Sequence, residues 1–224
     1  MKDKKKKGKK LKKIVKLFLF IVVLGLILYL LYNVCDTRIK NIYISGNKNI
    51  SDQDIIELAK LENYPDFFKT TNITIKKRIL KDERIKSVKI KRGFFEKIYI
   101  EVEEYKMLFI YDGKIVLENG NAIINKYDVK LPILINYTID VKYEQLIKKM
   151  NKIDQEVLEK ISEIKYDPND YDEDRFLLFM NDSNLVYVTL TRFDYLNKYN
   201  ETVTKLEGKK GTLYLDSGNY FEIR

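Results

Sequence analysis

The sequence of 224 residues contains no histidine and a single cysteine, Cys35. Histidine is the commonest general base and metal ligand, so its absence removes Ser-His and Cys-His catalytic pairs and most transition-metal sites. One cysteine forms neither an intramolecular disulfide nor a cysteine-based zinc cluster. Only carboxylates, lysines and tyrosines remain for acid–base chemistry. We therefore predict that the chain is not an enzyme and that it binds no cofactor and no metal.

Glycine and proline are also scarce, with nine Gly and three Pro. A composition this poor in both residues argues against a long disordered linker. The 17 Tyr and 11 Phe favour packed β-structure instead. A chain of this length allows one or two domains with cores of their own.

The positive charge is confined to the N-terminus. The chain has 42 Lys+Arg against 33 Asp+Glu, a net charge of +9. Residues 1–16 contain ten Lys and one Asp and so hold that whole net charge, which leaves 32 basic and 32 acidic residues in the remainder. A nucleic-acid-binding domain would carry basic charge in its folded part. We therefore expect no nucleic-acid partner.

An apolar span of about 20 residues follows the lysines, which is the length that an α-helix needs to cross a bilayer. A cleaved signal peptide would have a shorter apolar region, of about 7–15 residues, followed by a small-x-small site. Residues 32–35 contain no such site. The same lack of small residues before Cys35 argues against a lipoprotein signal. We therefore predict an uncleaved transmembrane helix at residues 14–35.

The charges beside this span predict its orientation. The lysine run precedes the span, and only Arg38 and Lys40 lie close behind it. The positive-inside rule then makes residues 1–13 a basic cytoplasmic tail and places residues 36–224 outside the cytoplasmic membrane. The lysines either only set this orientation or also bind acidic lipid headgroups.

The pattern of residues 36–106 predicts a small module with the element order β-α-α-β-β. Apolar residues alternate with polar ones over residues 41–45, as in a half-buried strand, and Ser51 can cap a short helix. Residues 88–91 and 98–103 alternate in the same way, with lysines on the first strand and glutamates on the second. This charge pattern predicts an antiparallel hairpin with cross-strand ion pairs.

The second half of the chain predicts a mixed, β-rich domain with flanking helices. Asp112-Gly113 between two apolar runs is typical of a type I′ hairpin. Helix spacing of apolar residues appears over residues 143–150 and 196–206. A further helix is expected to start at Asp154 and to end near Ser162-Glu163-Ile164-Lys165. The other predicted strands are residues 176–180 and 185–190, which form a hairpin, then residues 211–216, and a short strand after a turn.

This arrangement resembles the FtsQ/DivIB family of bacterial division proteins, in which a basic tail and one membrane anchor precede a POTRA domain. The family usually has a proline in the hairpin turn and another after the last strand, whereas this chain has Phe94-Phe95 and Met107 there. The matching stretches are residues 42–47, 50–51, 85–92, 98–104, 131–132, 205–206 and 211–216. The resemblance implies an α+β fold with a single N-terminal transmembrane helix, a POTRA domain at residues 36–106 and a β domain at residues 107–224.

The resemblance also implies a function. It indicates a non-enzymatic divisome scaffold at the division septum, which links division proteins across the cytoplasmic membrane during septum formation. The implied partners are the small coiled-coil division proteins of the FtsB/DivIC and FtsL type, septal wall-synthesis proteins and the membrane. In the family, the C-terminal part of the β domain contacts the coiled-coil proteins.

The physical route that we expect for this contact is strand addition. A strand at the edge of a sheet leaves backbone N–H and C=O groups unpaired, and a partner strand can use them. Residues 212–216 lie close to the chain's end and are the expected edge, and two aromatic residues follow them. Those two aromatic residues could instead be ordinary core residues. The predicted partner-binding residues are Thr212, Leu213, Tyr214, Leu215, Asp216, Tyr220 and Phe221.

Two other functions remain as alternatives. A membrane-anchored cell-wall hydrolase would need paired carboxylates in one cleft. The densest acidic stretch, residues 167–174, starts like a calcium-binding loop, but Arg175 and Asn181 stand where that loop needs Gly and Glu. The stretch is therefore interpreted as a solvated acidic loop. A translocation chaperone should contain many barrel strands, and residues 107–224 do not predict them.

Overall fold

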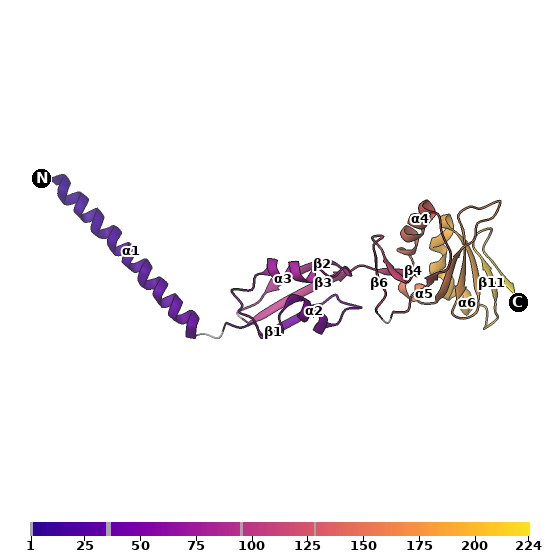
Figure 1. The fold of residues 1–224 in the computed structure, drawn as a ribbon, viewed down its shortest axis with the longest axis horizontal. Coiled ribbons are helices and arrows are strands. Elements are labelled where there is room, and N and C mark those ends of the chain that lie inside the picture. The colour runs from indigo at the N-terminus through magenta and orange to yellow at the C-terminus, as the bar shows by residue number, and fades with distance from the viewer. Residues whose placement is uncertain (1, 35–36, 95, 128) are drawn as a thin grey trace. The chain divides into compact units, whose positions relative to one another are not determined.

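A computed structural model describes residues 2–34, 37–94, 96–127 and 129–224. The chain divides into two compact units, Met1–Glu103 and Glu104–Arg224 (Figure 1). Cys35 lies outside the described residues. Each unit has a hydrophobic core of its own.

The N-terminal part of the first unit is one continuous helix, α1, Lys2–Val34. The helix therefore includes the lysine-rich segment that was predicted as a tail. Its apolar window, Lys13–Tyr32, is 20 residues long with a mean hydropathy of 2.9, and none of it is buried inside the protein. By length and composition, this window can cross a membrane, which fits single-pass anchoring.

The rest of the first unit is a three-stranded sheet with two helices. The strands lie in the order β1-β3-β2, and β1 runs parallel to β3. The predicted order β-α-α-β-β is confirmed. The elements are β1 Asn41–Ser45, α2 Asp52–Ala59, α3 Asn72–Ile79, β2 Ile85–Arg92 and β3 Lys97–Glu104.

Local sequence signals account for these elements. Ser51 forms a capping box with Asp54, in which each side chain bonds the other residue's backbone N–H. The apolar faces of both helices, which include Ile55 and Ile79, are fully buried in one core with the sheet residues Ile98 and Ile100. The predicted ion pairs across β2 and β3 are present as well: Lys89–Glu101 at 3.3 Å and Lys86–Glu103 at 3.2 Å.

The second unit is built on a nine-stranded sheet. Its strand order is β12-β11-β10-β9-β8-β7-β4-β5-β6. The strands are β4 Met107–Tyr111, β5 Lys114–Leu117, β6 Ala122–Ile124, β7 Ile133–Leu134, β8 Ile161–Tyr166, β9 Arg175–Met180, β10 Leu185–Thr189, β11 Gly211–Tyr214 and β12 Tyr220–Ile223. The helices are α4 Asp140–Met150, α5 Gln155–Leu158, the 3-10 helix η1 Leu190–Lys198 and α6 Tyr199–Thr204.

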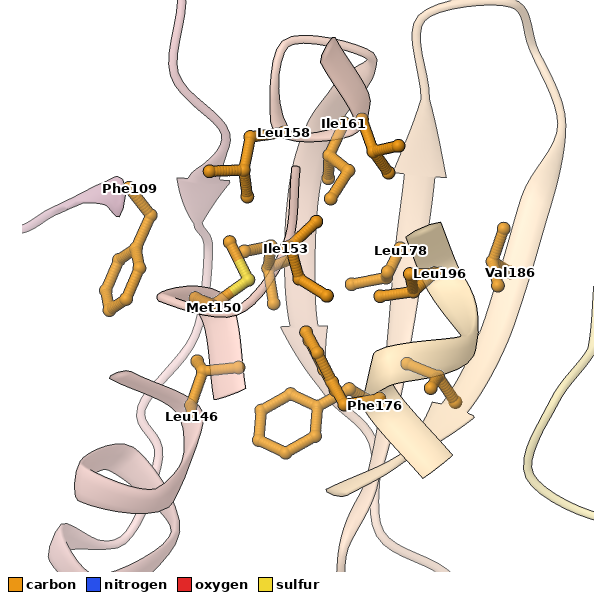
Figure 2. Packing of buried hydrophobic residues seen from close by; sticks show 14 of the residues in the cluster. Phe109, Leu146, Met150, Ile153, Leu158, Ile161, Phe176, Leu178, Val186 and Leu196 are labelled. Atoms are coloured by element: carbon orange, nitrogen blue, oxygen red, sulfur yellow. The ribbon is translucent and has the colours of Figure 1, made fainter. Parts of the chain in front are cut away.

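The core of this unit lies between the helices and one face of the sheet. Leu146 and Met150 of α4 project towards Phe176 and Leu178 of β9, and Leu196 of η1 packs into the same cluster (Figure 2). All five side chains are fully buried. The predicted helix face at residues 143–150 and the predicted hairpin of β9 and β10 are thereby confirmed.

The type I′ hairpin is also confirmed. Asp112 and Gly113 have φ values of 48° and 70°, and Tyr111 pairs with Lys114 around them. A type I′ turn requires positive φ at both central residues, which suits an Asp-Gly pair.

The helix predicted from Asp154 is wrong in its extent. It is the short α5, Gln155–Leu158, and the residues that follow it form strand β8. The pairing of β8 with β9 shifts register between Ile161 and Glu163. This irregularity buries both Ile161 and Ile164, which are three residues apart as on a helix face. Strand β8 therefore lacks the strict alternation of buried and exposed residues that marks a strand in a sequence.

Candidate functional site

The edge of the large sheet near the chain's end is formed by β12. Strand β11 pairs in parallel with β10 on one side and antiparallel with β12 on the other. The prediction that residues 212–216 form the edge is therefore wrong, because the last residues fold back and cover β11. The close approach of β12 to β11 requires glycine at position 211, since a Cβ there would lie 1.9 Å from the backbone oxygen of Glu222.

The register shows which backbone groups of β12 point outward. Arg224 donates its amide hydrogen to the carbonyl of Lys210 at 3.0 Å. The direction of backbone groups alternates along an antiparallel strand. The backbone N–H and C=O groups of Tyr220 and Glu222 therefore point towards β11, as the amide of Arg224 does. Phe221 and Ile223 then turn their N–H and C=O groups away from the sheet. The edge presents two donors and two acceptors to an added strand.

The structure separates the seven predicted residues into three kinds. Thr212, Leu213 and Leu215 are at most 7% exposed, so their side chains belong to the interior. Phe221 packs against the main core, while Tyr220 is 52% exposed on the edge strand. The last two residues, Tyr214 and Asp216, are held by neighbouring side chains. A role in partner binding stays a prediction for all seven.

Three tyrosines form a row across adjacent strands, which we call the tyrosine ladder. Tyr187 of β10, Tyr214 of β11 and Tyr220 of β12 occupy paired positions. The ring centroids are 5.5 Å apart for the first pair and 4.6 Å for the second, with interplanar angles of 22° and 13°. Stacking of this kind adds to the stability of a cross-strand pair. The ladder ends with the ring of Tyr220 on the edge strand.

An arginine packs against the tyrosine at the other end of the ladder. The Arg175 guanidinium lies 3.9 Å from the centroid of the Tyr187 ring, in a cation–π arrangement. Its Nε lies 3.1 Å from Asp216 Oδ2, an ion pair without hydrogen-bond alignment, and Nη1 lies 3.5 Å from Asp167. Asp216 is therefore connected to the ladder through Arg175. The hydroxyl of Tyr214 donates to Glu222 at 3.0 Å, and this hydrogen bond raises the pKa of Tyr214.

A buried polar cluster anchors the start of β11. Asn184 is fully buried, and its Oδ1 accepts the amide hydrogen of Gly211 at 3.0 Å. Its Nδ2 donates to the hydroxyl of Tyr199 at 3.1 Å, and that hydroxyl donates to Asp182 at 2.9 Å. Burial raises the pKa of Tyr199. The hydroxyl therefore keeps its proton and remains a donor in this cluster.

The turn between β11 and β12 is held from outside the hairpin. Arg192 donates through Nη1 to the carbonyl of Gly218 at 3.0 Å and to that of Leu215 at 3.3 Å. The edge strand is thus placed by side chains from β10 and η1 that are distant in sequence. Sequence reasoning missed Ile223, although the alternation of Phe221 and Ile223 with Glu222, after a Ser-Gly-Asn turn, was a usable signal.

The acidic stretch at residues 167–174 does not form a metal site. Asp174 pairs with Lys142, Asp172 accepts from the Thr189 hydroxyl at 3.3 Å, and Asp167 pairs with Lys165 at 2.8 Å. Among the residues that the structure describes, no group of three or more acidic or cysteine side chains could hold a metal ion. These carboxylates serve the local structure.

A hollow on the open face of the small sheet does not provide an acid pair either. It has a volume of about 320 Å³ and is lined by Tyr43, Tyr99, Lys89, Glu101 and three neighbours. Glu101 is the one carboxylate among the lining residues, and it is paired with Lys89. The residues that line this hollow therefore do not include the pair of carboxylates that a wall hydrolase would need.

Comparison with known proteins identifies the relatives of the chain. Residues 37–105 match the POTRA domain family of FtsQ type. The cell division protein DivIB of Bacillus subtilis (strain 168) is 30% identical over 215 residues, which cover 92% of this chain and 81% of that protein. The cell division protein DivIB of Bacillus anthracis is 31% identical over 229 aligned positions, which cover 96% of this chain and 86% of that protein.

A solved structure is also similar to part of the chain. It is the major extracytoplasmic domain of the trans isomer of the cell division protein DivIB from Geobacillus stearothermophilus, with 24% identity. The match covers 47% of this chain and 96% of that one, with a TM-score of 0.39. The family resemblance, the α+β fold class and the prediction of a protein that is not an enzyme are confirmed by the relatives and the domain match together. The chain belongs to the DivIB family of cell division proteins, and it is a non-enzymatic scaffold of the division machinery.

Proposed function

We propose that this scaffold links division proteins across the cytoplasmic membrane at the septum. The lysine-rich residues 1–13 lie in the cytoplasm, and the POTRA domain at residues 36–106 and the β domain at residues 107–224 lie outside. The asymmetry of the flanking charges supports this orientation. The two domains then face the compartment of septal wall synthesis, where wall-synthesis proteins are proposed partners.

The partner-binding element in this proposal is β12. A strand from a coiled-coil division protein of the FtsB/DivIC type, in complex with its FtsL-type partner, pairs with the outward backbone groups of Phe221 and Ile223. Backbone hydrogen bonds supply affinity in such an addition, and side chains at alternate positions supply specificity. The observation that carries the proposal is the position of β12 at the end of the sheet with these groups turned outward.

Besides β12, the described residues form three sheet edges, β6, β2 and the five-residue β1. The first two fit strand addition less well. Strand β6 has three residues, which limits the number of backbone hydrogen bonds. Strand β2 carries Lys86, Lys89 and Lys91, and lysines are typical of edges that are protected against added strands. Strand β12 combines four residues with exposed Tyr220 and Ile223 side chains, at 52% and 56% exposure.

The test removes one outward N–H group from the edge. Proline lacks that donor and is tolerated on edge strands where the N–H faces solvent, so Ile223→Pro should leave the pairing of β12 with β11 in place. The matched control Ile223→Ala shortens the same side chain but keeps the N–H. Binding of the full chain in nanodiscs to the partner complex is measured by biolayer interferometry. We expect at least a roughly tenfold higher Kd for Ile223→Pro, and for Ile223→Ala a rise of roughly threefold at most.

Equal affinity of the two variants would contradict strand addition at this edge. A cellular experiment tests the wider function separately. Depletion of the protein should produce filaments without septa, and the wild-type and Ile223→Ala chains should restore division where Ile223→Pro does not.

A further inference from the structure

Three large apolar side chains of the first unit are strongly exposed at one end of the POTRA domain. Phe68 is 55% exposed, Ile73 is 81% exposed and Phe94 is 90% exposed. We call these three residues the juxtamembrane patch. They come from the loop before α3, the first turn of α3 and the turn after β2.

One arginine brings these three segments together. The Arg92 guanidinium lies 4.4 Å from the ring centroid of Phe67, and it donates to the carbonyl oxygens of Phe67 and Thr70. Its Nε donates to Asn72 Oδ1 at 2.6 Å. Phe67 and Asn72 immediately precede two residues of the patch, and Phe94 follows Arg92 by two positions. The patch is therefore held on a fixed framework.

This end of the domain is also where the chain arrives from α1. The helix ends at Val34, and Thr37 is three peptide units further on, so the two Cα atoms are separated by at most about 11 Å. The carbonyl of Thr37 accepts the amide hydrogen of Phe67 at 2.7 Å, and its hydroxyl donates to Asp66 at 2.6 Å. The loop that carries Phe68 is thus attached to the first described residue after the helix.

The last residue of the apolar span contacts the same loop directly. The hydroxyl of Tyr32 donates to Asp66 at 2.6 Å, and its ring meets Phe68 edge to face at 6.2 Å between centroids. Lys69 Nζ lies 5.9 Å from the centroid of the Tyr32 ring. An aromatic residue that ends a membrane span lies at the membrane–water interface. Phe68 and Lys69 are therefore at the level of the lipid headgroups.

We propose that the juxtamembrane patch inserts into the interface of the leaflet at which α1 ends, so that the POTRA domain binds the phospholipid surface. Aromatic and aliphatic side chains beside a cation are typical of segments that bind a phospholipid surface. The apolar side chains would lie at the boundary of the acyl chains, and Lys69 would lie among the phosphates. Continuity with the membrane span identifies the occupant as lipid. This inference does not depend on which protein binds β12.

The chain contains no tryptophan, so a single introduced Trp reports its own position. Ile73→Trp and Phe94→Trp replace exposed side chains and leave the core unchanged. The matched control is Lys81→Trp, an exposed position just beyond the other end of α3, about 12 Å from Ile73 along the helix axis. The full-length variants are placed in nanodiscs whose phospholipids carry bromine on the acyl chains near the headgroup, because bromine quenches Trp fluorescence at short range.

We expect a roughly twofold loss of fluorescence and a blue-shifted emission for Trp at positions 73 and 94, and solvent-like emission without quenching for Trp at position 81. Equal quenching at positions 73 and 81, or none at either, would overturn the proposal. A second variant tests the patch as a unit. Adding Phe94→Asp to Ile73→Trp should abolish the quenching, and quenching that persists would show that the patch does not act in lipid binding.

Discussion

Gly211 allows the most specific prediction about the edge strand, because the residue lies one strand in from the edge, opposite Ile223, and determines where β12 lies. A Cβ at position 211 would be 1.9 Å from the backbone oxygen of Glu222 and 2.8 Å from its carbonyl carbon. Backbone atoms cannot rotate away as a side chain can. We therefore expect Gly211→Ala to displace β12 from β11, although the edge residues Phe221 and Ile223 are themselves unchanged.

The displacement can be estimated from contact distances. Carbon and carbonyl oxygen approach to about 3.3 Å, so β12 would have to move by about 1.4 Å. An N–H···O bond of 3.0 Å, such as that from Arg224 to Lys210, would lengthen well beyond the range of a hydrogen bond. Loss of about three such bonds, at about 1 kcal/mol each, destabilises the docked strand by about 3 kcal/mol. That corresponds to a factor of roughly one hundred in the docking equilibrium of β12.

Amide hydrogen exchange measures this equilibrium directly. The amides of Glu222 and Arg224, which face β11, should lose protection by roughly two orders of magnitude in Gly211→Ala, and affinity for the partner complex should fall with them. Gly218→Ala is the control, because its Cβ would meet the Tyr220 ring at 3.1 Å, and a ring can yield by a few tenths of an ångström. Native protection of Glu222 in Gly211→Ala would refute the steric argument.

Two further predictions concern the polar groups that support each unit. Tyr199→Phe should destabilise the β domain in urea by about 1–3 kcal/mol, because the buried Asn184 amide loses one of its two acceptors and Asp182 loses a donor. Tyr195→Phe, at a 43% exposed ring, should change the free energy of unfolding by less than about 0.5 kcal/mol. Burial alone would raise the pKa of Asp66, but hydrogen bonds from two hydroxyls and two amides lower it well below its usual range. Its stabilising contribution is therefore complete above the unfolded pKa of about 3.9 and is lost as the pH falls below that value. Resistance of residues 64–70 to an acid protease should decline between about pH 4 and pH 2, and Asp66→Asn should remove that dependence.

The parts of the fold that the sequence predicted are those determined by residues close together in the chain. The helix cap at Ser51 and the I′ turn at Asp112-Gly113 each depend on at most four consecutive residues. The buried face of α4 follows helix periodicity alone. Strand β8 was missed because a bulge breaks its alternation of buried and exposed residues, so nothing in the sequence opposed a helix continuing from Asp154.

The identity of the edge strand could not be obtained from residue types. Thr212, Tyr214, Tyr220 and Phe221 all have high β propensity, so each is equally suited to a central or an edge position. What distinguishes them is the pairing of β11 on both sides, which requires Gly211 against Glu222 and the Arg192 contacts to the turn. These constraints act between segments and appear only in three dimensions. Because an added strand recognises backbone groups, a substitution that moves the edge should impair binding more than one that changes its exposed side chains.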